Sequence, residues 1–279
     1  MKLFLRNLTI FLFVLLLSSV SFSQSLRTIH EKSFDVSSGE LLEIQSDVGD
    51  IRIKTWDENT VHIKVYGNRK AEEDVDFHFE KTSKGVLVDA EKDGSWNWFS
   101  GVKVKYEINV PKTFNLDLRT GGGDVIVLDL YGEIEAKTSG GDIDFENIDG
   151  EISATTSGGD VKIINAVGNV RSSTSGGDID IKSKDGKVSA STSGGDVTLE
   201  YYGENYGIDL GTSGGDITVL IPDNLKADVN LKTSGGDIEC DVEARVKEVT
   251  RSKFLGIMNG GGTDLTCKTS GGDITVRTF

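Results

Sequence analysis

Aspartate is the most regularly spaced residue of this chain, and its carboxylate can bind a metal ion or accept backbone N–H groups. Four successive steps of 18 residues separate the first five aspartates of the series, and the later steps are 20, 21 and 36 residues. Each one ends a Gly-Gly-Asp sequence. The column consists of Asp124, Asp142, Asp160, Asp178, Asp196, Asp216, Asp237 and Asp273.

Carboxylates stacked at a strand spacing of ~4.8 Å repel each other by roughly 1 kcal/mol per neighbour, even at the dielectric of water. Something must offset that repulsion, and two explanations are open. Each Asp accepts backbone N–H groups within its own glycine turn, as Asx residues commonly do, or the column holds a ladder of Ca²⁺ ions. The calcium-binding β-roll has a nonapeptide period, half of the period here, so we favour the turn and expect no cofactor.

A segment with three aromatic residues, Gly94 to Gly101, is the best candidate for ligand binding. Trp96, Trp98 and Phe99 stand there among turn-forming residues. Exposed rings can stack on sugar faces or seat a partner protein. The other explanation is that they cover the open N-terminal end of the fold, whose last hydrophobic layer must be hidden from water.

Catalytic patterns are missing from the sequence, so we expect no enzyme. The histidines are His30, His62 and His78, all outside the repeats, and neither His-Glu-x-x-His nor Gly-x-Ser-x-Gly occurs. His62 and His78 fall on the polar face of their predicted strands. Gly121 to Gly123 precede a strand rather than a helix, so a phosphate-binding helix N-terminus is also lacking.

The elements that must position the aspartates are short strands, two in each 18-residue unit. Val161 and Ile163 share one face of a strand while Asp160 and Lys162 share the other, and this alternation recurs in every copy. A unit too small for a helix plus a strand predicts a β-solenoid, in which stacked coils bury their inner faces against one another. The predicted fold is therefore all-β, with coils of about 18 residues and glycines at the corners.

The chain divides into three predicted parts. Residues 1–23 have the basic start, apolar run and small-residue end of a signal peptide, although an uncleaved anchor remains an alternative. Residues 24–118 form a non-repetitive β region, and residues 119–279 form the solenoid repeats. The 36-residue step before Asp273 contains either a degenerate coil or a protruding hairpin.

A duplicated proline pattern supports continuity between the last two parts. Val110-Pro111 leads into one Gly-Gly-Asp turn and Ile221-Pro222 leads into another. In addition, Val48-Gly49-Asp50 resembles an early copy of the repeat. Proline therefore marks the same structural event twice.

Charge and cysteine content limit the partners and the compartment. Removing Lys2 and Arg6 with the signal peptide leaves 28 Lys and Arg against 45 Asp and Glu, a formal charge of −17. Nucleic acid and anionic lipid would be repelled. The signal peptide predicts an extracytoplasmic location (periplasm, cell surface or secreted), without a transmembrane segment in the mature chain. Cys240 and Cys267 either pair there or remain two buried thiols.

The repeated Thr-Ser-Gly-Gly-Asp-Ile, the Val110-Pro111 entry and the closing Asn259 to Gly262 before Leu265 resemble the bacterial putative-adhesin family. This is a domain of unknown function related to the head domain of auto-transporter adhesins. The resemblance covers roughly residues 34–279. It implies a right-handed β-helix on an extracytoplasmic protein and brings no catalytic residues.

The sequence therefore predicts a non-enzymatic, adhesin-like surface or interaction module whose partner is a glycan or an envelope protein. Flat outer faces could bind weakly at many repeated points and so gain avidity. Two alternatives are a structural or envelope-stress component and a polysaccharide-active enzyme.

Overall fold

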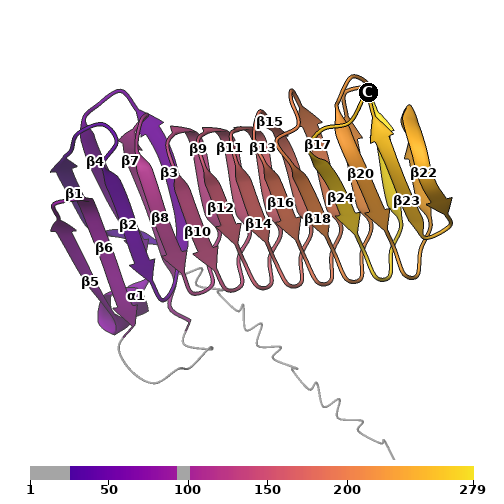
Figure 1. Cartoon of the computed structure of the whole chain (residues 1–279). Coiled ribbons are helices and arrows are strands. Elements are labelled where there is room, and N and C mark those ends of the chain that lie inside the picture. Colours follow the sequence, from indigo (N-terminus) through magenta and orange to yellow (C-terminus); the bar gives the residue numbers. More distant parts are fainter. Residues whose placement is uncertain (1–25, 93–100) are drawn as a thin grey trace, which may run out of the picture.

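The computed structural model describes residues 26–92 and 101–279, which form two long, mainly parallel β-sheets facing each other (Figure 1). In spatial order, the 12-stranded sheet contains β1 (Arg27–Asp35), β4 (Thr60–Gly67), β7 (Val104–Pro111), β3 (Asp50–Trp56), β9 (Val125–Tyr131), β11 (Ile143–Asp149), β13 (Val161–Val167), β15 (Ile179–Lys184), β17 (Val197–Tyr202), β19 (Ile217–Ile221), β25 (Ile274–Thr278) and β21 (Ile238–Asp241). The 13-stranded sheet contains β22 (Ala244–Thr250), β23 (Lys253–Met258), β20 (Ala227–Lys232), β24 (Asp264–Lys268), β18 (Ile208–Gly211), β16 (Val188–Ser191), β14 (Val170–Ser173), β12 (Ile152–Thr155), β10 (Ile134–Thr138), β8 (Asn115–Thr120), β2 (Leu41–Ser46), β6 (Gly85–Lys92) and β5 (Val75–Lys81).

Residues 18 apart lie beside each other in the sheets, which confirms the predicted solenoid. In the 12-stranded sheet Ile143 pairs with Val161, Val161 with Ile179, and Ile179 with Val197. The same spacing aligns Ile134 with Ile152 in the 13-stranded sheet. Each coil thus contributes one strand to each sheet, and its neighbours supply the hydrogen bonds that it cannot make alone.

The space between the sheets is a continuous hydrophobic core, with the alternation that the sequence predicts. Val161 and Ile163 of β13 are buried, whereas Lys162 between them is exposed. On the opposite sheet Ile152 and Ala154 of β12 are buried in the same way. A slip of one residue would move such side chains into water, so the register is strongly specified.

At the N-terminal end the order of coils in space differs from the order in the chain. The coil β2–β3 lies between β6–β7, the last parallel coil at this end, and β8–β9, which continues the stack. Beyond β6–β7 lie β4 and β1 on one sheet and β5 on the other, all antiparallel, and the short helix α1 (Arg69–Asp74) precedes β5. Between β7 and β8 the chain therefore passes over one coil.

The C-terminal end repeats this arrangement in reverse. The last coil, β24–β25, lies between β18–β19 and β20–β21. The connection from β19 to β20 therefore skips the position in the stack that β24–β25 occupies. Both passages follow the duplicated Val-Pro and Ile-Pro pairs, because Pro111 ends β7 and Pro222 directly follows β19. The prolines do mark the same structural event, the step over one coil.

The 36-residue step contains the antiparallel hairpin β22–β23. The hairpin does not stand away from the solenoid, because β23 also pairs with β20 and buries Phe254 and Met258. Of the two alternatives for this segment, the hairpin is correct, but it packs against the stack instead of protruding.

Candidate functional site

The carboxylates of the aspartate column join neighbouring coils. Asp160 Oδ1 accepts the backbone N–H of Asp178 at 2.8 Å, and the Asp160 N–H donates to Asp142 Oδ1 at 2.9 Å. The expected acceptor role is present, but the expected donor was wrong, because the N–H belongs to the next coil rather than to the same turn. The bonded order along the column is Asp50, Asp124, Asp142, Asp160, Asp178, Asp196, Asp216, Asp273 and Asp237.

The residues around each aspartate make this contact possible. The hydroxyl of buried Thr156 donates to the Gly141 carbonyl of the previous coil at 2.9 Å and accepts the Gly159 N–H at 3.3 Å. A Cβ at Gly159 would lie 2.1 Å from the Gly141 carbonyl oxygen, so only glycine fits there. The Thr-Ser-Gly-Gly-Asp turn therefore links each coil to its neighbours by hydrogen bonds. Within the described residues no group of three or more His, Cys, Asp or Glu side chains could hold a metal ion.

A second column at another corner was not recognised in the sequence. Asp129, Asn147 and Asn165 have φ of 58–60°, and Asn147 Nδ2 donates to Asp129 Oδ1 at 2.7 Å. Asn165 continues the chain of bonds to Asn147 at 3.0 Å. Asx residues tolerate this left-handed conformation. Their 18-residue spacing is the signal that could have revealed them.

A polar groove of about 350 Å³ lies at the C-terminal ends of four strands near the N-terminal end of the 13-stranded sheet. It extends over β6, β2, β8 and β10, and mixed charges line it. Carboxylates come from Asp47, Asp89 and Glu91, and cations come from Arg119 and Lys137. The remaining lining residues are Gln45, Ser46, Ala90, Thr120, Thr138 and Ser139.

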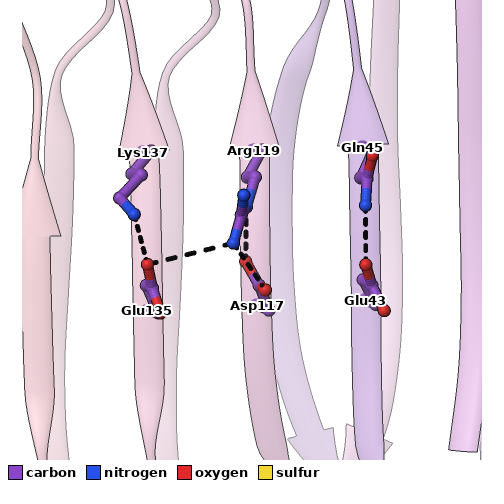
Figure 2. A network of polar contacts seen from close by, with 6 residues as sticks. All are labelled: Glu43, Gln45, Asp117, Arg119, Glu135 and Lys137. Atoms are coloured by element: carbon purple, nitrogen blue, oxygen red, sulfur yellow. Dashed lines mark hydrogen bonds and ion pairs between the residues drawn. The ribbon is translucent and has the colours of Figure 1, made fainter.

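The cations of the groove are held by carboxylates on their own strands (Figure 2). Arg119 donates through Nε and Nη2 to the two oxygens of Asp117, each at 3.0 Å, and its other neighbour is Glu135 at 3.9 Å. Lys137 forms an ion pair with Glu135, which lowers the pKa of that carboxyl. The hydrogen bond to Asp117 raises the pKa of Arg119. Residues two apart on a strand share a face, so these side chains lie along the strands as a preformed polar row.

Sequence reasoning missed this groove because its strands are not consecutive in the chain. Asp89 and Glu91 of β6 reach the groove only because β6 pairs with β2, on whose other side β8 lies. The predicted ligand-binding residues, Trp96, Trp98 and Phe99, lie outside the described residues. Their segment follows β6, whose last residue, Lys92, donates its N–H to Asp47 Oδ2 at 2.9 Å.

The three histidines contact residues that do not line the groove. His62 contacts Glu31 at 2.9 Å and stacks on Trp56, and His78 is exposed beside Glu80. His30 packs against Phe77 and Phe79, where burial lowers its pKa.

The two cysteines are free thiols. Cys240 lies on β21 of one sheet and buried Cys267 on β24 of the other. Burial raises the pKa of both, that of Cys240 to about 11. Both thiols are therefore protonated at neutral pH.

A family model described as Toastrack DUF4097 matches residues 40–277. No curated protein matches the chain. Within residues 26–92 and 101–279, no helix combines the length and apolar character needed to cross a membrane.

Several solved structures match this chain at low sequence identity. A "putative adhesin" from Bacteroides fragilis is 15% identical, with a TM-score of 0.49, over 91% of this chain and 98% of that one. A "putative lipid binding protein" from Parabacteroides distasonis is 15% identical, with a TM-score of 0.45, over 89% and 96%. A "putative adhesin" from Parabacteroides merdae is 13% identical, with a TM-score of 0.40, over 89% and 95%. Similarity this low gives no argument about a ligand.

Proposed function

Because the chain belongs to the Toastrack DUF4097 family, whose model matches most of its length, we propose that it is a non-enzymatic interaction module. It acts outside the cytoplasm and binds a polar glycan in the groove of the 13-stranded sheet. The groove with carboxylates at one side and cations at the other is the observation that carries this proposal. The proposed extracytoplasmic location is inferred from the signal-peptide pattern of residues 1–23.

The chemistry of the groove suits a glycan better than a flat apolar partner. Sugar hydroxyls both donate and accept hydrogen bonds, and the groove offers acceptors from Asp89 and Glu91 and donors from Arg119 and Lys137. These side chains lie on β6, β8 and β10 of one hydrogen-bonded sheet, so little order must be imposed on the protein when a ligand binds.

Glycan-array binding by purified protein tests this proposal. The double variant Arg119→Ala/Lys137→Ala should lose at least about tenfold in affinity, the loss expected when a bound polar group is left without its charged partner. Arg171→Ala is the matched control, since Arg171 is an exposed arginine on β14 of the same sheet, outside the groove. Binding that is unchanged in the double variant would contradict the assignment of the groove.

The aromatic segment needs a separate test. Trp96→Ala/Trp98→Ala loses glycan binding if these rings take part, as the sequence predicts. If they only cover the end of the solenoid, the variant keeps its glycan affinity and loses thermal stability instead. An envelope protein as the ligand is tested by a pull-down from envelope extract, in which the Arg119→Ala/Lys137→Ala protein should fail to capture what the wild type captures.

Export is tested independently of binding. Mass spectrometry of protein recovered from the producing cells should find an N-terminus at Gln24. A chain that keeps its first 23 residues and stays in the cytoplasm would refute the proposed location.

A further inference from the structure

The two ends of the solenoid are closed differently. At the N-terminal end the sheets meet, because His30 of β1 packs against Phe77 and Phe79 of β5 with ring centroids 4.9 and 5.4 Å apart. Phe77 also lies 6.5 Å from Tyr106, whose side chain is fully buried. Aromatic side chains from both sheets therefore cover the last hydrophobic layer at this end.

At the C-terminal end one sheet extends past the other. The 12-stranded sheet ends at β21, while the 13-stranded sheet continues through β23 to its edge strand β22 (Figure 1). Residues 245–250 of β22 are all exposed, and Val246 and Val249 have exposed fractions of 50% and 66%. Ala244, the first residue of β22, and Val242, two residues before it, are only partly buried. Among the described residues no strand pairs with the outer edge of β22, so this end presents apolar side chains along a strand edge, the usual template for addition of another strand.

We propose that β22 is an interface between two copies of this chain, joined end to end as a twofold dimer. The strands run antiparallel about an axis midway between Lys247 and Glu248. Each Lys247 then lies opposite Glu248 of the second copy, and each Val246 lies opposite Val249. Every such contact occurs twice, as a twofold interface requires. The 13-stranded sheet thereby becomes continuous across the dimer.

The order of residues on β22 favours a second copy in this register over other partners. An axis through Lys247 would place lysine against lysine, and an axis through Glu248 would place glutamate against glutamate, both of which are unfavourable for directly opposed residues. Only the intermediate axis pairs opposite charges and valines together. Glu248 already contacts Lys253 of its own chain at 2.7 Å, so its carboxylate would be shared between two lysines.

The edge also carries features that limit open-ended strand addition. The pairing of β22 with β23 is irregular between Val246 and Glu248, and bulges and lysines commonly guard strand edges. In the proposed dimer these features select one register, because Lys247 finds a carboxylate only in the twofold arrangement. Two copies then close the edge, and no fibre grows.

Light scattering during size-exclusion chromatography tests the proposal with charge variants. The wild type should have twice the monomer mass. Lys247→Glu places two glutamates opposite each other at both contacts, Glu248→Lys does the same with lysines, and each variant should be monomeric. An equimolar mixture of the two variants should recover the dimer, because the acidic pair on one strand then faces the basic pair on the other. Lys187→Glu, an equal charge change in a loop away from this end, should remain dimeric.

Several results would overturn this inference. A wild type that is monomeric at every accessible concentration would show that the bulge and Lys247 keep the edge unpaired. Single variants that stay dimeric, or a mixture that stays monomeric, would place any dimer contact elsewhere. Circular dichroism of each variant separates these outcomes from unfolding, since a folded monomer keeps the β-sheet signal.

Discussion

Asp237 donates its backbone N–H to the carboxylate of Asp273 at 2.7 Å, although Asp273 follows it by 36 residues in the chain. Asp273 in turn donates its own N–H to Asp216 at 2.7 Å. The final coil, β24–β25, thus lies between two coils that precede it in the sequence, β18–β19 and β20–β21. Within residues 26–92 and 101–279 the coil β20–β21 has no earlier strand as a lateral neighbour in either sheet, so its place in the stack depends on the end of the chain.

Weakening the final coil should therefore release the coil beyond it. Ile274→Ala removes a fully buried side chain that lies between Ile217 and Ile238 and should cost about 2–5 kcal/mol. Hydrogen exchange should show amides of β20–β25 losing protection together, while β10–β17 stay protected. Thr275→Ala, on the outer face of the same strand, is the control. Loss of protection spread evenly over all coils would contradict this dependence.

The glycines of a single turn should differ in their tolerance of a side chain. A Cβ at Gly159 would meet the Gly141 carbonyl oxygen at 2.1 Å, whereas a Cβ at Gly158 has no neighbour closer than 3.8 Å. Gly159→Ala should therefore destabilise the protein by about 3 kcal/mol or more, and Gly158→Ala should change the stability by less than about 1 kcal/mol. Thermal unfolding of both variants measures the difference. Equal melting temperatures would mean that the coils can separate at little cost.

The stack itself could be predicted from the sequence, but the order of its last coils could not. A period of 18 residues directly encodes which residues pair, because a constant coil length places equivalent positions of successive coils beside each other. The order of the ends is not encoded in the same way. Thr-Ser-Gly-Gly-Asp-Ile occurs unchanged at residues 212–217, 233–238 and 269–274, so each of the last two copies fits equally well beside the first.

The groove, like the spatial order of the last coils, depends on which strands become lateral neighbours. Its acidic side comes from β6 and its basic side from β8 and β10, and β2 lies between the two sides because the chain passes over the β2–β3 coil after Pro111. Periodicity identifies the face on which each side chain lies, and Asp89, Glu91, Arg119 and Lys137 do have the outward parity of their strands. It does not identify which non-repetitive strand becomes a lateral neighbour. That choice depends on connections of unequal length, which carry no repeat signal.

The aspartate column makes a prediction about charge and hydrogen bonding. Asp160→Asn keeps Oδ1 as an acceptor for the Asp178 N–H and removes repulsion with the adjacent carboxylates, so the variant should be at least as stable as the wild type. Asp160→Ala removes the acceptor and should cost about 0.5–1.5 kcal/mol. Urea unfolding at low and high salt measures both effects. The gain in the Asn variant should shrink with salt, because these carboxylates are exposed and screened.

A result in which Asp160→Asn is less stable than Asp160→Ala would contradict this account of the column. It would mean that the carboxylate charge itself stabilises the turn. Ser157→Ala serves as the control, because Ser157 is an exposed neighbour that precedes the glycine pair of the same turn.

The N-terminal end should weaken at acidic pH because of His30. Burial against Phe77 and Phe79 and the charge of Lys32 lower the pKa of His30 below its ordinary value of 6.5, and Glu72 opposes them. The neutral ring is preferred in the folded state. Its contribution to stability is therefore fully present above pH 6.5 and is lost as the pH falls through the lowered pKa. His30→Phe keeps a ring against Phe77 and Phe79 without a titrating group, so between about pH 7.5 and about pH 5 its melting temperature should fall less than that of the wild type. His78→Gln, which removes an exposed histidine of β5, is the control. A His30→Phe variant with the same acid sensitivity as the wild type would assign that sensitivity to other groups.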